Sequence, residues 1–185
     1  CGQQRQHTLV DRPLGSSTNL CPRRPLESGT HAMSILWLAY GRHLARPRME
    51  QDAPGHRVAG LGFVRDYHLT FRAVPSVPGP SLPSAEAAPH KRLAGLLYHI
   101  SYDEWEHLKQ LHLPSYAPYN VSVLPLGSRS TAITAQWFLP LAHQEQPPLG
   151  GLVYQVFNAA RILPGYPGLV LQELEQMALT LRPGL

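Results

Sequence analysis

The residues best suited to chemistry lie in a short turn, residues 40–44 (YGRHL), which follows an apolar run over 35–39. The run is short and carries the β-favouring residues Ile35 and Trp37, so it predicts a buried strand. Gly41 can adopt backbone angles that are closed to other residues. A strand that ends in such a turn often presents backbone N–H groups to an anion. The turn therefore predicts an anion-binding loop, and the simpler alternative is a core strand followed by an ordinary turn.

The turn and several later motifs resemble one known family. Residues 40–44 resemble the Tyr-Gly-Ser-Asn-Leu signature of the γ-glutamylcyclotransferase family, with Arg42 and His43 in place of its serine and asparagine. Later segments resemble further motifs of that family in the same order: 48–49, 54–60, 67–71, 95–100 and 158–166. The resemblance covers roughly residues 34–181, and the order of the motifs is more specific than any single one of them.

The resemblance implies an α+β fold, with a small, mixed, β-barrel-like sheet and flanking helices. We assign this domain to residues 33–185. Residues 1–32 are polar, lack periodicity and cannot bury much apolar surface, so they predict a flexible N-terminal extension. A single domain is also what a chain of 185 residues favours.

The resemblance also implies a reaction. A γ-glutamylcyclotransferase binds a γ-glutamyl amine, amino acid or peptide and cyclises it to 5-oxoproline with release of the amine, without a metal or organic cofactor. This lyase or acyl-transfer chemistry needs a base for the ammonium proton, donors for the oxyanion and a cradle for the α-carboxylate. Carried over position by position, the substrate-binding residues are Tyr40, Gly41, Arg42, His43, Leu44 and Tyr119.

The glutamate that serves as base in the family is missing at its expected position. Counting back from Tyr119 places it at His112, which becomes the candidate catalytic residue. A neutral histidine can act as a general base near neutral pH, but once protonated it would repel the substrate ammonium. Two alternatives therefore stay open: a catalytically silent homologue that binds a small carboxylate or a protein partner, or a His112 that merely ends a helix beside a proline.

Composition excludes several other classes of protein. The net charge of +4, from 16 basic and 12 acidic residues, is too small for a nucleic-acid footprint. No stretch approaches the length of a transmembrane helix. The ten histidines do not form a convincing ligand set without a carboxylate cluster, and the two cysteines both precede the domain, so we expect no metal.

We expect a cytoplasmic protein that acts on a small molecule. The first residue, Cys1, raises one further alternative. A lipid-modified cysteine at a mature N-terminus would anchor the protein to a membrane as a lipoprotein.

Periodicity and helix-breaking residues predict the elements that position the turn. Ser101, with Glu104 three residues later, predicts a capping box on a helix that ends before Pro114. The other principal helix is expected over 168–181, and a short one over 43–49. The expected strands are 34–40, 58–64, 68–73, 93–100, 120–125 and 130–139, and the expected loops are 74–89 and 147–151.

Overall fold

The computed structural model describes residues 34–72, 82–113, 115–127, 131–141 and 150–181. The predicted extension over 1–32, including Cys1, lies outside these residues. The elements in chain order are β1 (Ile35–Ala39), the 3-10 turn η1 (Arg42–Leu44), α1 (Arg46–Asp52), β2 (Arg57–Arg72), β3 (Leu82–Ile100), α2 (Tyr102–His112), β4 (Tyr116–Pro125), β5 (Ile133–Pro140), α3 (Gly150–Arg161) and α4 (Gly168–Thr180).

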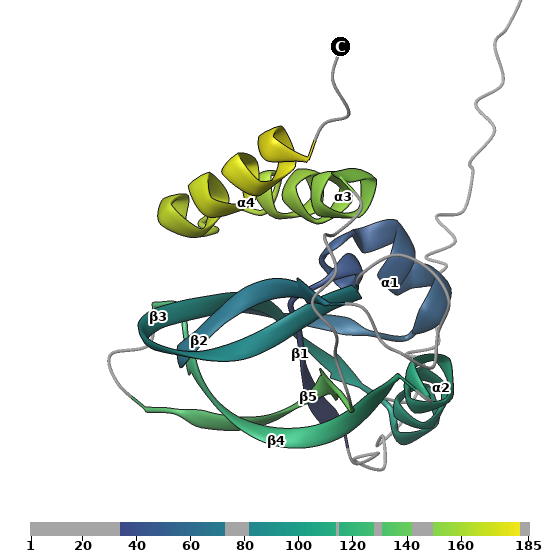
Figure 1. The fold of residues 1–185 in the computed structure, drawn as a ribbon. Coiled ribbons are helices and arrows are strands. Elements are labelled where there is room, and N and C mark those ends of the chain that lie inside the picture. The colour runs from purple at the N-terminus through teal and green to yellow at the C-terminus, as the bar shows by residue number, and fades with distance from the viewer. Residues whose placement is uncertain (1–33, 73–81, 114, 128–130, 142–149, 182–185) are drawn as a thin grey trace, which may run out of the picture. The chain divides into compact units, whose positions relative to one another are not determined.

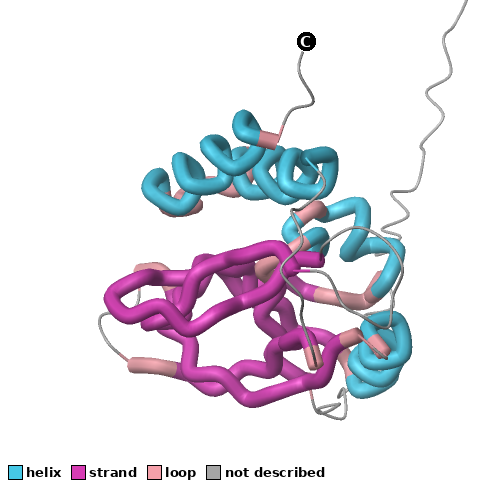
Figure 2. Tube along the Cα trace, viewed as in Figure 1, coloured by secondary structure: helices cyan, strands magenta, loops and turns pink. Residues whose placement is uncertain are grey.

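The strands form a closed barrel in the order β1-β3-β2-β4-β5 (Figures 1 and 2). β1 pairs antiparallel with β3, and Trp37 pairs in parallel register with Gln136 of β5, which closes the barrel. All other pairings are antiparallel. The mixed, barrel-like sheet and the α+β class that the sequence predicted are therefore confirmed.

Two hydrophobic cores lie on opposite sides of the barrel wall. Side chains alternate between the faces of a strand, so Trp37 joins the core that also holds helical residues, whereas Leu38 joins a core built from strands. β3 divides in the same way, with Tyr98 in the first core and Leu97 in the second. This two-sided burial explains why β1 and β3 read as continuous apolar runs in the sequence.

The helices cover one side and one end of the barrel. α3 and α4 pack against each other in one layer, and α2 lies next to β4 (Figure 1). The predicted capping box is present: the Ser101 hydroxyl accepts from the Glu104 N–H, and Glu104 accepts from the Ser101 N–H. Glu104 also accepts from the N–H of Gly55 at 2.5 Å, which ties α2 to the loop after α1. No helix in the described part of the chain is long and apolar enough to span a bilayer.

Two predictions about strands were wrong. The two short strands expected on either side of Asp66 are one long strand, β2, because Asp66 forms a bulge instead of a turn. Asp66 has φ 58°, and its carboxylate accepts from the N–H of His90, which keeps the two strands together through the bulge. The proline-rich loop expected over 74–89 is strand from Leu82 onward, in a hairpin that tolerates proline at its edge.

A prediction about residues 147–151 was also wrong in part. Gly150 and Gly151 open helix α3 instead of belonging to a loop, so the described part of the chain has four α-helices, one more than the three that the sequence predicted. Val153, Val156 and Ala160 of α3 are fully buried, and this spacing gives the helix one apolar face. Two glycines at the start of a helix destabilise it, and packing against α4 compensates for this loss in α3.

We expect Gly95→Ala to destabilise the protein by about 1–3 kcal/mol through overpacking. A Cβ at Gly95 would lie 2.7 Å from the backbone oxygen of Ala39 and 2.7 Å from the side chain of Leu38, so β1 would have to shift. Urea unfolding measures the decrease in the free energy of unfolding. The matched control is Gly151→Ala, whose Cβ would meet nothing within 4 Å and whose free energy of unfolding should not fall. Equal stability of Gly95→Ala and its parent would contradict the close packing of β1 on β3.

Candidate functional site

A pocket of about 560 Å³ lies beside the C-terminal end of β1. It brings together five of the residues predicted from the sequence: Tyr40, Gly41, Arg42, His43 and His112. The two others do not line it. Leu44 is buried in the core, and Tyr119 lies on β4 with 48% of its surface exposed.

Sequence reasoning missed several residues of the pocket. Trp37, Pro83, Tyr116 and Phe138 all form part of its wall. Tyr116 is the first residue of β4, and it was overlooked because the count toward the base started at Tyr119. The others carry no local signal, because an aromatic residue in a strand is far more often part of the core than of a binding site.

Gly41 has φ −116° and ψ −135°, which is neither the α-helical nor the β region of the backbone map. It is also needed for space, because a Cβ on Gly41 would lie 2.9 Å from two carbon atoms of the Pro83 ring. Glycine therefore allows the start of β3 to close over the turn and form one wall of the pocket.

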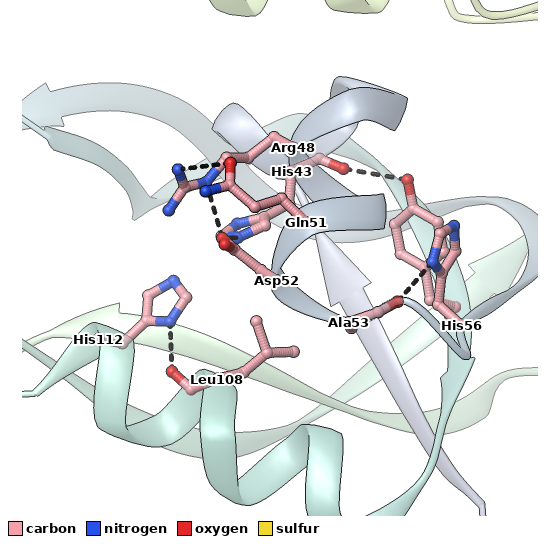
Figure 3. A network of polar contacts seen from close by, with 9 residues as sticks. His43, Arg48, Gln51, Asp52, Ala53, His56, Leu108 and His112 are labelled. Carbon is pink, nitrogen blue, oxygen red and sulfur yellow. Dashed lines mark hydrogen bonds and ion pairs between the residues drawn. The ribbon is translucent and has the colours of Figure 1, made fainter.

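His43 is buried in the wall and held by a carboxylate on α1. Its Nε2 donates to Asp52 Oδ2 at 2.8 Å, and Arg48 Nε lies 2.7 Å from the same oxygen (Figure 3). Burial lowers the pKa of His43 to about 3, and nearby His112 acts in the same direction. His43 is therefore neutral at physiological pH, and the charge of Asp52 is matched by Arg48.

His112, the last residue of α2, is also neutral and has a fixed tautomer. Its Nδ1 lies 2.7 Å from the carbonyl oxygen of Leu108, and because a carbonyl only accepts, Nδ1 carries the hydrogen. Nε2 is then an acceptor. Figure 3 shows the second ring nitrogen pointing away from α2, toward the side where Asp52 lies. The ring stacks on Phe138 with 4.1 Å between centroids, and burial lowers its pKa to about 4.

The pocket contains one cation that no carboxylate neutralises. Arg42 forms no ion pair with any residue in the described part of the chain, although burial and Arg48 lower its pKa. No aspartate or glutamate is among the described lining residues. The two tyrosine hydroxyls donate within the protein, Tyr40 to the carbonyl of Phe138 and Tyr116 to that of Pro83, and burial raises the pKa of both.

This inventory of charges suits an anion. Two neutral imidazoles and an unpaired guanidinium face a wall of aromatic rings. Within the described ranges, no three His, Cys, Asp or Glu side chains come together in a way that could hold a metal ion. The site can therefore hold a carboxylate by charge, and it offers nitrogen lone pairs instead of a carboxylate to the rest of a ligand.

Similarity to known proteins is found in the fold of this chain and not in its sequence. No protein-family model and no curated protein sequence matches it. A solved gamma-glutamyl cyclotransferase matches with a TM-score of 0.70 and 17% identity, over 77% of this chain and 86% of that one. An uncharacterized protein from Homo sapiens gives the same values. YkqA from Bacillus subtilis matches with a TM-score of 0.64 and 18% identity, over 82% of this chain and 56% of that one.

These similarities define the class of the fold. The chain has the γ-glutamyl cyclotransferase fold, and the resemblance predicted from its motifs is confirmed at that level. At 17–18% identity, the comparisons say nothing about its reaction.

We expect the free energy of unfolding to fall as the pH drops from 6.5 toward 4, and to fall less steeply in His112→Phe. The pKa of His112 is about 4 in the folded protein and 6.5 ordinarily, so between these values the unfolded chain binds more protons. One such group contributes a slope of up to about 1.4 kcal/mol per pH unit. Phenylalanine keeps a ring against Phe138 without titrating. Urea unfolding at several pH values measures both slopes, with an unchanged m value as the control. Identical slopes would contradict a buried neutral His112.

Proposed function

We propose that this protein binds a small γ-glutamyl carboxylate in the pocket beside the turn, and that it cyclises this ligand slowly or not at all. The fold it shares with a gamma-glutamyl cyclotransferase supports the class of ligand. The pocket volume of about 560 Å³ lies within the range of small-molecule sites. The site is lined mainly by apolar and aromatic residues with a few polar groups, as such sites usually are.

The unpaired guanidinium of Arg42 is the observation that carries the proposal. Its side chain lines the pocket and is exposed to solvent, so a ligand carboxylate that enters the pocket can reach it and form charge-assisted hydrogen bonds with it. The resemblance implies that backbone N–H groups of the turn complete the cradle. The position of Arg42 in place of the family's serine adds a full positive charge to that cradle.

The acid–base inventory is the reason for expecting little turnover. In cyclisation, the α-nitrogen loses a proton to a base and attacks the γ-carbonyl carbon; the bond from that carbon to the leaving nitrogen then breaks, and the leaving amine takes up a proton. An α-ammonium has a pKa of about 8, whereas His112 has a pKa of about 4. Proton transfer to His112 is thus unfavourable, because its pKa lies well below that of the ammonium.

Cyclisation with His112 as base is the second candidate function. One observation favours it: the hydrogen bond from Nδ1 to Leu108 leaves Nε2 as an acceptor at the pocket wall. A bound carboxylate beside the ring would raise the pKa of His112 and improve it as a base.

We expect Arg42→Gln to weaken binding of a γ-glutamyl amino acid by at least about tenfold, since a charge-assisted hydrogen bond contributes about 1.5–3 kcal/mol. Calorimetric titration measures the affinity. The matched control is Arg46→Gln, which removes the same charge from an exposed side chain paired with Glu50 outside the pocket. Equal losses in both variants would mean that net charge matters and that Arg42 makes no direct contact.

We expect His112→Glu to gain 5-oxoproline release from γ-glutamyl substrates, because it restores a carboxylate that can hold the ammonium and accept its proton. Chromatographic assay of 5-oxoproline compares it with the parent protein and with His107→Glu, which places the same charge on the exposed side of α2. Rapid release by the parent, abolished in His112→Ala, would overturn the proposal in favour of the second candidate.

A further inference from the structure

A second pocket, of about 720 Å³, lies between the second half of β2 and α4 and shares no lining residue with the pocket beside the turn. One wall is the five consecutive residues 68–72 of β2, and the other is a stripe of α4 from Gln172 to Leu181. Successive side chains of a strand point to opposite faces, so five residues in a row indicate that the edge of β2 borders the pocket. The pocket is therefore a groove along a strand edge, and we call it the β2–α4 groove.

This edge of β2 has no strand beside it in the part of the chain that the structure describes. β3 pairs with β2 as far as Arg72, along the opposite edge. β4, the other neighbour of β2 in the barrel, pairs with it only at Gly62 and Phe63. The groove edge from Tyr67 to Phe71 therefore carries backbone N–H and C=O groups that no described strand takes up.

Pro83 shows which backbone groups point into the groove. It lies opposite Phe71 in the β2–β3 pair and has no N–H to donate to it. Its carbonyl accepts from the Tyr116 hydroxyl at 2.7 Å, on the side away from β2. Phe71 and Pro83 thus form a non-hydrogen-bonded pair, whose polar backbone groups point away from each other. Because the two kinds of pair alternate along an antiparallel ladder, Tyr67, Leu69 and Phe71 direct their N–H and C=O groups into the groove.

The helix wall of the groove matches the strand edge in length. The stripe of α4 spans about 13 Å, at 1.5 Å per residue, and residues 68–72 span about 13 Å of strand. An ion pair of 2.5 Å between Lys91 and Glu173 joins β3 to α4 beside the groove. The layer of α3 and α4 stands next to this part of the sheet, so it obstructs the approach of another sheet but not of a single extended chain (Figure 1).

We propose that the β2–α4 groove binds an extended peptide segment of another protein, which adds to the sheet as a strand beside β2. The N–H and C=O groups of Tyr67, Leu69 and Phe71 pair with the backbone of that peptide, in the recognition mode known as strand addition. This proposal concerns a surface separate from the pocket that contains Arg42, so it is independent of the proposed function.

The walls also specify the side chains of the peptide. Leu69, Phe71, Met177 and Leu181 belong to one hydrophobic cluster, so they make one side of the groove apolar. Side chains of an added strand alternate between the two faces of the sheet, and every second one therefore faces this cluster. The peptide is expected to carry an apolar residue at every second position.

Amide hydrogen exchange tests the free edge in the protein alone. We expect the N–H groups of Tyr67, Leu69 and Phe71 to exchange at least about tenfold faster than those of His68 and Thr70, which donate to β3. Exchange followed by NMR on the full chain measures this alternation. Equal protection of all five amides would overturn the proposal, because the edge would then be covered. Protection of Tyr67, Leu69 and Phe71 that rises with protein concentration would overturn it in favour of a second copy.

Peptides selected from a display library of short random sequences supply the probe. We expect the selected peptides to carry apolar residues at alternate positions and to slow exchange of the amides of Tyr67, Leu69 and Phe71. N-methylation of one peptide N–H that faces β2 should weaken binding by at least about threefold, because it removes a hydrogen bond. N-methylation of the next residue, whose N–H faces away, should change it less. Equal effects at both positions would overturn strand addition.

A matched pair of variants on α4 tests the groove itself. Gln176 and Glu175 are both exposed, but only Gln176 lines the groove. Gln176→Trp should fill the groove and weaken the selected peptides by at least about tenfold, whereas Glu175→Trp should leave their affinity unchanged. Equal affinity for both variants, or a library that yields no peptide dependent on the groove, would overturn the proposal.

Discussion

The pocket depends on β1 being hydrogen-bonded along both of its edges. β1 pairs with β3 on one side and with β5 on the other, so its position and register are fixed where the barrel closes. Its alternate side chains are then forced into the two separate cores. Because the register of β1 is fixed, the position of the turn that follows it is fixed as well, between α2 and the start of β3.

Close packing around that turn determines its electrostatics. Removal of water lowers the pKa of both His43 and His112, and each ring donates its N–H to an oxygen of the protein. Burial of Asp52 is tolerable because Arg48 and His43 both contact it. What remains unbalanced is the charge of Arg42, which makes the pocket electrostatically suited to an anion.

The same arrangement explains why a shared fold need not mean a shared reaction. A γ-glutamyl cyclotransferase fold supplies a barrel, a turn and a nearby helix end. The side chains at three positions there determine the chemistry of the pocket. The resemblance places Arg42, His43 and His112 where the family has a small hydroxyl, an amide and a carboxylate. In the proposed function, these three residues give a site that attracts a carboxylate and offers it uncharged hydrogen-bonding partners.

The sequence by itself determined the features that depend on local chemistry. The apolar run of β1, the capping box of Ser101 and Glu104, and the final amphipathic helix are each encoded by neighbouring residues, and each was predicted. The order of the motifs was sufficient to predict the fold, and it placed Arg42, His43 and His112 in one candidate site.

The tertiary structure decided whatever depends on residues that are distant in sequence. Hairpin pairing makes β2 one bulged strand, and packing on α4 makes α3 a helix despite its two glycines. Trp37 and Asp52 carry no local sign of a role, because their importance comes from what surrounds them: an indole N–H without an acceptor, and a carboxylate held by His43 and Arg48. Sequence patterns report the preferences of a segment, whereas burial and charge balance at a site are properties of several segments brought together by the fold.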